Sequence, residues 1–323
     1  MSAAAAFGTV TGAGIAVSAV QVVLTVAGAP LLVGMMRQVR ARMEGRAGAG
    51  IGQPWRDLRK LMRKEPLDPH GTGPVFRTAP LLQVAATAVV AAAIPFVSVD
   101  TGLGQAADLI AVVALLTLGT AVLALAGLDT GTAFGGMGAS REMTITALAE
   151  PTVLVATFAL STRVGSTNLP AIVDAGLKDA GRVVSPVSVL AAFALAAVVL
   201  AEAGRLPVDN PSTHLELTMV HEAMVLEYSG PDLALVELAA AMRLSVLLGL
   251  WSALFLPWGT ATSTGALAVL GGTASFVVKV GVLGAVLAAG EVFMAKLRLF
   301  RVPELLAGSF LLSVLAVAAS FFL

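Results

Sequence analysis

Three acidic residues lie inside or at the ends of long apolar runs. Glu150 lies about eight residues into one run, directly before Pro151, whose ring disturbs the hydrogen bonding of a helix. Glu202 ends a second run, and Glu291 lies near the end of a third. A carboxylate at membrane depth is costly and usually marks an ion path. We therefore interpret these three residues as candidate proton carriers.

Structural roles remain open for the same residues. Glu150 could be a hydrogen-bonded structural carboxyl group. Glu202 and Arg205 are spaced i,i+3, so they could form an ordinary ion pair on one helical face. Lys279 is the one base deep in its apolar run. It could pair with a carboxylate and exchange a proton, or extend toward the membrane surface.

The segment 204–234 is the richest in titratable side chains. A capping box of Thr213 and Glu216 predicts a helix from this point, and closing that box is the simplest role for Glu216. The predicted helix would carry titratable groups, which together can hold or pass protons near neutral pH. The candidates in this segment are Arg205, Asp209, Glu216, His221 and Glu227.

Metal and nucleotide chemistry find no support in the sequence. The chain has no cysteine, so it offers no thiolate for zinc or for an iron–sulfur cluster. His214 and His221 lie about two helical turns apart, which is too far to share one ion. No glycine-rich phosphate loop or nucleophile elbow occurs. We expect no cofactor in this chain and no nucleic-acid partner.

The apolar runs themselves predict an all-α integral membrane protein. Hydrophobic residues make up 57% of the 323 residues, and they cluster in runs long enough to cross about 30 Å of hydrocarbon. Residues 1–323 are therefore expected to form a single membrane domain. The eight predicted spans are 10–36, 78–98, 106–128, 143–162, 183–203, 235–257, 262–295 and 303–323.

Basic residues predict how the chain is oriented. Half of the 20 Lys and Arg residues fall in the loop 37–77, which the positive-inside rule places in the cytoplasm. The acidic segment 204–234 then also faces the cytoplasm, and both termini face outward. These features predict a multi-pass protein of the cytoplasmic (inner) membrane.

An amphipathic helix is predicted within the loop 37–77. From Gln53 to Met62, apolar side chains fall on one helical face and basic side chains on the rest. Such a helix could lie in the membrane interface beside acidic lipid. It could equally provide a docking surface for a soluble partner, and the two roles are compatible.

Two sequence motifs carry a family resemblance. The stretch 201–211 reads AEAGRLPVDNP, and 226–230 reads LEYSG. They resemble the membrane-subunit family of respiratory complex I subunit 1, also called the H subunit. The stretch 210–230 is closer to the related subunit of group 4 nickel–iron hydrogenases, including formate hydrogenlyase subunit 4 and hydrogenase-4 component C. Arg141 and Glu150 resemble the spacing of an Arg and a Glu in the fourth span of that family.

The resemblance implies roles for individual residues. Glu150 and Glu202 would be membrane carboxylates of the half-channel through which ions enter. An acidic funnel facing a soluble arm would contain Arg205, Asp209, Glu216 and Glu227. The EYSG motif adds Tyr228 to this junction. Asp57 and Glu65 would lie near the subunit that holds the iron–sulfur clusters.

The resemblance also implies partners and a function. The expected partners are a soluble iron–sulfur subunit, a hydrogenase-like large subunit that could hold a nickel–iron centre, antiporter-like membrane subunits and lipid. The chain would anchor the soluble arm and link its electron transfer to proton or sodium translocation. Complex I members usually carry an acid at the end of span one, where this chain has Ala29-Pro30-Leu31-Leu32. That difference favours the hydrogenase branch. A quinone-binding subunit of an NADH:quinone oxidoreductase, a standalone ion-coupled transporter and a structural anchor remain alternatives.

Overall fold

A bundle of long helices forms the protein in the computed structural model, which describes residues 12–205, 208, 219–294 and 301–322. No strand occurs within these ranges beyond two isolated bridges, which confirms the all-α prediction. Seven described helices are long and apolar enough to cross a membrane: α1 (Gly12–Met43), α3 (Pro74–Ala93), α4 (Leu109–Asp129), α5 (Ala133–Val164), α10 (Gly230–Phe255), α11 (Ala266–Phe293) and α12 (Val302–Ser320).

The remaining predicted span is a shorter helix, α8 (Pro186–Glu202), with 17 residues. At 1.5 Å per residue it is about 25 Å long, which is less than the thickness of a typical hydrocarbon core. It packs against α5, α10 and α12, so it belongs to the bundle. The eight predicted spans thus correspond to seven long helices and one short one. The largest errors in the predicted ends are at α1, which continues to Met43, and α5, which begins at Ala133.

Local signals explain where these helices begin and end. Ser185 caps α8 by accepting a hydrogen bond from the backbone N–H of Ser188, and Pro186 follows at the first helical position, where no N–H is needed. Thr132 caps α5 in the same way. At the other end of α5, Gly165 takes a left-handed conformation with φ +72°, which is accessible to glycine without a steric cost.

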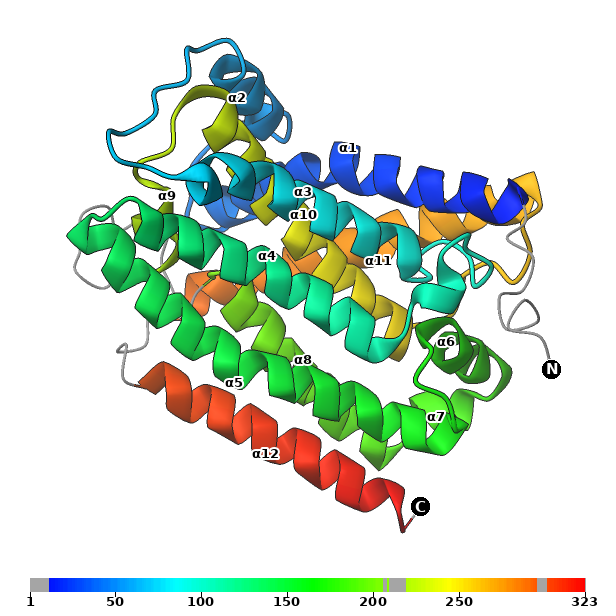
Figure 1. The fold of residues 1–323 in the computed structure, drawn as a ribbon. Coiled ribbons are helices and arrows are strands. Elements are labelled where there is room, and N and C mark those ends of the chain that lie inside the picture. Colours follow the sequence, from blue (N-terminus) through cyan, green and yellow to red (C-terminus); the bar gives the residue numbers. More distant parts are fainter. Residues whose placement is uncertain (1–11, 206–207, 209–218, 295–300, 323) are drawn as a thin grey trace, which may run out of the picture.

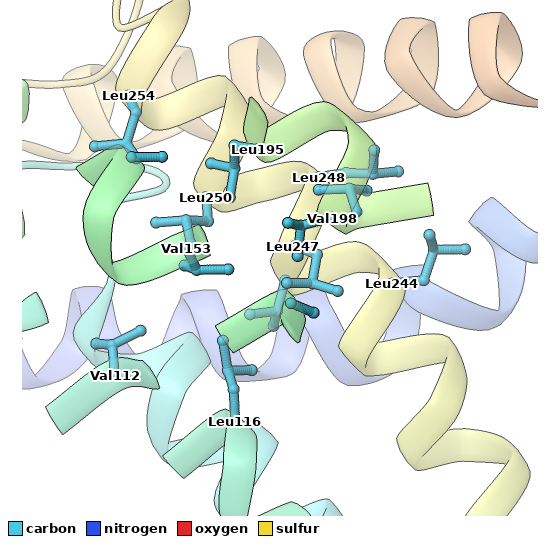
Figure 2. Close-up of a cluster of buried hydrophobic side chains, with 14 of the residues drawn as sticks. Val112, Leu116, Val153, Leu195, Val198, Leu244, Leu247, Leu248, Leu250 and Leu254 are labelled. Atoms are coloured by element: carbon cyan, nitrogen blue, oxygen red, sulfur yellow. The ribbon is translucent and has the colours of Figure 1, made fainter. Parts of the chain in front are cut away.

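Helix α10 lies at the centre of the apolar core. Its leucines pack against side chains of α4, α5 and α8, as Figure 2 shows for Val112, Val153 and Leu195. Along its length α10 also contacts α1, α3 and α11. A polar residue on α10 therefore faces other helices on most sides.

Short helices mark the two ends of the bundle (Figure 1). At one end, called here the inner end, lie α2 (Gln53–Leu61) and α9 (His221–Val225). At the opposite, outer end lie α6 (Leu169–Lys178) and α7 (Ala180–Val183), and the 3-10 turn η2 (Gly104–Ala106) precedes α4. The start of α1 and the end of α12 both lie at the outer end, as an even number of crossings requires.

Helix α2 is the amphipathic helix predicted from the sequence, and it packs on α1 and α10. A Cβ atom at Gly34 of α1 would lie 1.9 Å from the backbone oxygen of Ile51, so glycine is required for this close approach. The Trp55 indole Nε1 donates a hydrogen bond of 3.1 Å to the carbonyl oxygen of Ala27, and Leu58 is buried. These contacts fix α2 against the bundle.

Candidate ion-coupling site

A cavity of about 710 Å³ opens between α1, α2, α8 and α10 and extends to residues of α3 and α4. Its wall is unusually charged for a space between apolar helices. The charged and titratable lining residues are Arg37, Arg40, Arg46, Asp57, Glu142, Glu202, Arg205, His221, Glu222, Glu237 and Arg243. The cavity therefore brings together residues from the basic loop 37–77, the segment 204–234 and the membrane helices.

Glu202 forms an ion pair with Arg243 of α10 at this cavity. The Glu202 side chain is only 4% exposed, and its Oε1 atom has no hydrogen-bond partner. Arg243 also donates through Nη1 to the carbonyl oxygen of Leu116, at 2.8 Å. Arg243 thus joins α8, α10 and α4 around one buried carboxylate.

The ion pair of Glu202 with Arg205, which the sequence left open as an alternative, does not form. Helix α8 ends at Glu202, and Gly204 has a positive φ of +55°. The Arg205 N–H then bonds back to the carbonyl oxygen of Leu200 at 3.3 Å, a pattern typical of a helix terminus closed by glycine. Because the chain leaves the helix here, the i,i+3 geometry that the prediction assumed does not form.

Arg205 instead pairs with Glu291 of α11. Arg205 Nη1 lies 3.5 Å from Glu291 Oε1, and Arg40 Nη1 of α1 lies 3.7 Å from Glu291 Oε2. Burial lowers the pKa of the Arg205 guanidinium, while the Glu291 carboxylate acts in the opposite direction. An arginine remains protonated at neutral pH in either case. Glu291, with a side chain 3% exposed, therefore pairs with two converging cations and links three parts of the fold.

Glu150 of α5 belongs to the same electrostatic group as Glu202 and Arg243. Its Oε1 atom is buried without a hydrogen-bond partner. Glu202 is the carboxylate that pairs with Arg243, and Glu150 interacts electrostatically with both members of that pair.

Glu237 of α10 was missed by the sequence analysis. Glu237 lines the cavity, so its side chain is exposed although α10 is central to the bundle. Its charged neighbours are Arg37 of α1 and Asp57 of α2. The signal was available, because Glu237 lies seven residues after Gly230 in an apolar helix. The predicted span began at residue 235, only two residues before Glu237, so this acid did not stand out as one inside the membrane.

The predicted helix carrying Glu216, His221 and Glu227 together is wrong for its described part. Met219 and Val220 are not helical, α9 extends only over His221–Val225, and Glu227 follows its end. Val220 is 2% exposed, and Arg141 of α5 donates to the Met219 carbonyl oxygen at 3.0 Å. These contacts turn the chain into the bundle before α9. Asp209 and Glu216 lie outside the described residues.

Tyr228 has a structural position beside α3. Its ring stacks on Phe76 with centroids 4.1 Å apart, and its hydroxyl donates to the Phe76 carbonyl oxygen at 2.8 Å. That carbonyl lacks its usual helical donor, because the residue four positions later is Pro80, which has no N–H. Burial is the main cause that raises the pKa of Tyr228, and Asp232 and Asp129 add to it.

The structure separates the other predicted residues from one another. Asp57 and His221 line the cavity, whereas Glu65 and Glu227 do not. The Glu65 backbone lies close to Gly230, where a Cβ atom would be 2.8 Å from its oxygen. Within the described residues, no carboxylate lies within ion-pair distance of Lys279. No group of three histidine or acidic residues in these ranges could hold a metal ion.

Known proteins resemble this chain over most of its length. A family model described as NADH dehydrogenase matches residues 15–321. Formate hydrogenlyase subunit 4 of Escherichia coli (strain K12) is 34% identical over 88% of this chain and 92% of its own length. Hydrogenase-4 component C of the same organism is 36% identical over 72% of each chain.

A solved structure has the same fold. It is a chain of the membrane-bound sulfane sulfur reductase, an archaeal respiratory membrane complex, with a TM-score of 0.83 and 21% sequence identity. The match covers 94% of this chain and 98% of that chain. The family match and the two Escherichia coli relatives show which family this is. The chain belongs to the NADH dehydrogenase family of membrane subunits, which includes subunit 1 of respiratory complex I and formate hydrogenlyase subunit 4.

Proposed function

We propose that this chain is the membrane-anchoring and coupling subunit of an energy-converting, complex I-like redox complex of the group 4 hydrogenase or formate hydrogenlyase type. The observation that supports this proposal most is a series of carboxylates that leads from the cavity into the bundle. It begins with the exposed Glu237 in the cavity, continues to the buried Glu202 side chain and reaches Glu150 of α5. A structural anchor has no need for such a series, because a carboxylate inside the bundle is costly.

In this proposal the chain moves protons or sodium ions without redox chemistry of its own. Electron transfer in a soluble arm changes the charge or the shape at the inner end. Arg205 responds through its pair with Glu291, and the Glu202–Arg243–Glu150 group then gains or releases one proton. The family names of the relatives and the electrostatic interaction of Glu150 with the Glu202–Arg243 pair support this mechanism.

The soluble arm would dock at the inner end of the bundle. The loop 37–77 and the segment 204–234 meet there, and Tyr228 joins the second to α3. We infer an iron–sulfur subunit and a hydrogenase-like large subunit as the partners on this face, in the cytoplasm, with both termini outward. Antiporter-like subunits would adjoin the membrane helices. Because the chain lacks cysteine, single cysteines replacing Arg46 or Lys178 can test this orientation. A membrane-impermeant maleimide should label only Lys178→Cys from outside.

Glutamine variants of the two buried carboxylates test the coupling role. In vesicles containing the whole complex, Glu150→Gln and Glu202→Gln should each abolish ion uptake, with electron transfer either stopped or uncoupled. Co-purification of the iron–sulfur partner should persist, because glutamine keeps the shape of the side chain. Glu304→Gln is a matched control, since Glu304 is an exposed acid in the first turn of α12. Wild-type pumping stoichiometry in both variants would refute the proposed path.

A quinone-binding role is the second candidate, because the cavity is within the 300–1,000 Å³ range typical of small-molecule sites. Photolabelling of the purified complex with an azidoquinone would distinguish the two. Saturable labelling of α1, α2 or α10 supports a quinone site. Stability of the isolated chain with unaided ion transport would instead indicate a standalone transporter.

A further inference from the structure

A second hollow of about 570 Å³ lies between α2 and the first turns of α10. Its apolar walls come from both helices, and its charged lining residues are two exposed arginines of α2, Arg56 and Arg59. We call it the α2–α10 groove. Its lining residues are Trp55, Arg56, Leu58, Arg59, Met62, Ala234, Leu235 and Leu238.

The depth of α2 places this groove at the edge of the hydrocarbon. Ile51, just before α2, rests on Gly34 of α1, which is 22 residues after the helix begins at Gly12. At 1.5 Å per residue the separation is about 33 Å, close to the ~30 Å thickness of a hydrocarbon core. The Trp55 indole reaches deeper, because its Nε1 bonds to Ala27, which lies seven residues, or about 10 Å, nearer the start of α1.

The two parts of the groove suit the two parts of a phospholipid. Leu235 and Leu238 extend the apolar wall down the first turns of α10, toward the hydrocarbon. Arg56 and Arg59 lie at the α2 side, where headgroups are found, and a guanidinium can bind a phosphate through two parallel hydrogen bonds. The loop 37–77 adds further positive charge and no compensating excess of acids.

We propose that the α2–α10 groove binds one anionic phospholipid, with an acyl chain along α10 and its phosphate on Arg56 and Arg59. Leu58 lines both this groove and the charged cavity. An acyl chain in the groove therefore covers the lateral side of the cavity at Leu58. This inference goes beyond the proposed function and does not depend on ion coupling.

Photolabelling in vesicles tests the proposal. The whole complex, purified through a tag on this chain, is reconstituted with a trace of phosphatidylglycerol that carries a diazirine on its acyl chain. The labelled peptides should come from residues 53–62 and 230–238. A phosphatidylcholine with the same diazirine should label them several-fold less, because it carries no net negative charge.

Charge variants supply the decisive comparison. A guanidinium that is hydrogen-bonded to the lipid phosphate is worth at least about a fivefold change in affinity. The double variant Arg56→Gln/Arg59→Gln should therefore lower labelling by phosphatidylglycerol about 30-fold when the lipid is dilute. Lys60→Gln/Arg63→Gln removes the same charge from exposed positions that do not line the groove, and it should leave labelling within twofold. Leu238→Trp should block the groove and reduce labelling by both lipids.

Three results would overturn the proposal. They are equal labelling by the two lipids, equal losses in the two double variants, and replacement of lipid labelling by a cross-link to a partner protein over the groove. Because the readout is lipid binding, a failure here is distinct from a failure of the ion-coupling proposal.

Discussion

Replacing Arg243 with methionine should leave the Glu202 carboxylate buried without its cation. The Glu202 side chain is 4% exposed, and one of its oxygens already lacks a hydrogen bond. Removing one partner of a buried ion pair typically costs about 3–5 kcal/mol. The Leu116 carbonyl, which also loses its bond to Arg243, keeps a hydrogen bond from the Thr120 hydroxyl at 3.3 Å. The cost therefore arises mainly from the carboxylate.

We expect Arg243→Met to destabilise the protein by about 3–4 kcal/mol at pH 7. The double variant Glu202→Gln/Arg243→Met buries no charge and should lose only about 1 kcal/mol.

Thermal stability of the solubilised complex measures these effects. The fraction that remains monodisperse after heating gives an apparent Tm for the wild type, both single variants and the double variant. At about 2 °C per kcal/mol, Arg243→Met should lower it by roughly 6–8 °C at pH 7, and the double variant by about 2 °C. Arg77→Gln is the control, because Arg77 forms an exposed pair with Asp68 at 3.0 Å, and such pairs contribute little.

The result that would refute this reasoning is additivity. If Arg243→Met costs as much in the Glu202→Gln background as alone, the two side chains are not coupled.

Two further predictions concern the inner end of the bundle. Gly34→Ala should displace the start of α2, because the added Cβ would lie 1.9 Å from the backbone oxygen of Ile51. Faster proteolysis of the loop before α2 would report this displacement. Gly28→Ala is the control and should have no effect, because no atom lies within 4 Å of its Cβ position. Tyr228→Phe keeps the ring stack but leaves the Phe76 carbonyl without a hydrogen-bond donor. The expected loss of stability is about 1–3 kcal/mol, and a lower apparent Tm would measure it. Because the pKa of Tyr228 is raised in the folded protein, the wild type should lose stability as the pH rises above about 10. Tyr228→Phe should lack that contribution, and identical pH profiles would contradict the assignment.

The membrane helices were predictable because each must bury about twenty apolar residues in sequence order. The length of an apolar run therefore carries nearly all the information needed, and α8 was detected although it has only 17 residues. The amphipathic character of α2 could also be predicted, from the distribution of its apolar and basic residues. The packing of α2 on Gly34 was not, because a close approach between two backbones leaves only a glycine as its signal.

The partners of the charged residues were the part that sequence could not predict. Glu202 pairs with Arg243, 41 positions away, and Arg205 pairs with Glu291 of α11. Sequence spacing detects only neighbours on one helix, so the only partner that it offered for Glu202 was Arg205. A single glycine conformation at Gly204 was enough to prevent that pair. Glu237 shows the other limit, because an error of five residues in the start of a helix changed its predicted depth.

The short helix α8 has an electrical consequence. Glu202 ends α8 and also lines the cavity that opens at the inner end, so the polar surroundings reach the carboxylate while the neighbouring helices continue past it. Most of a transmembrane voltage then falls between Glu202 and the outer end. An ion moving from the inner face to Glu202 does little work against that voltage. The cost of about 2.3 kcal/mol per charge at 100 mV falls on the steps beyond it, where Glu150 is the next carboxylate.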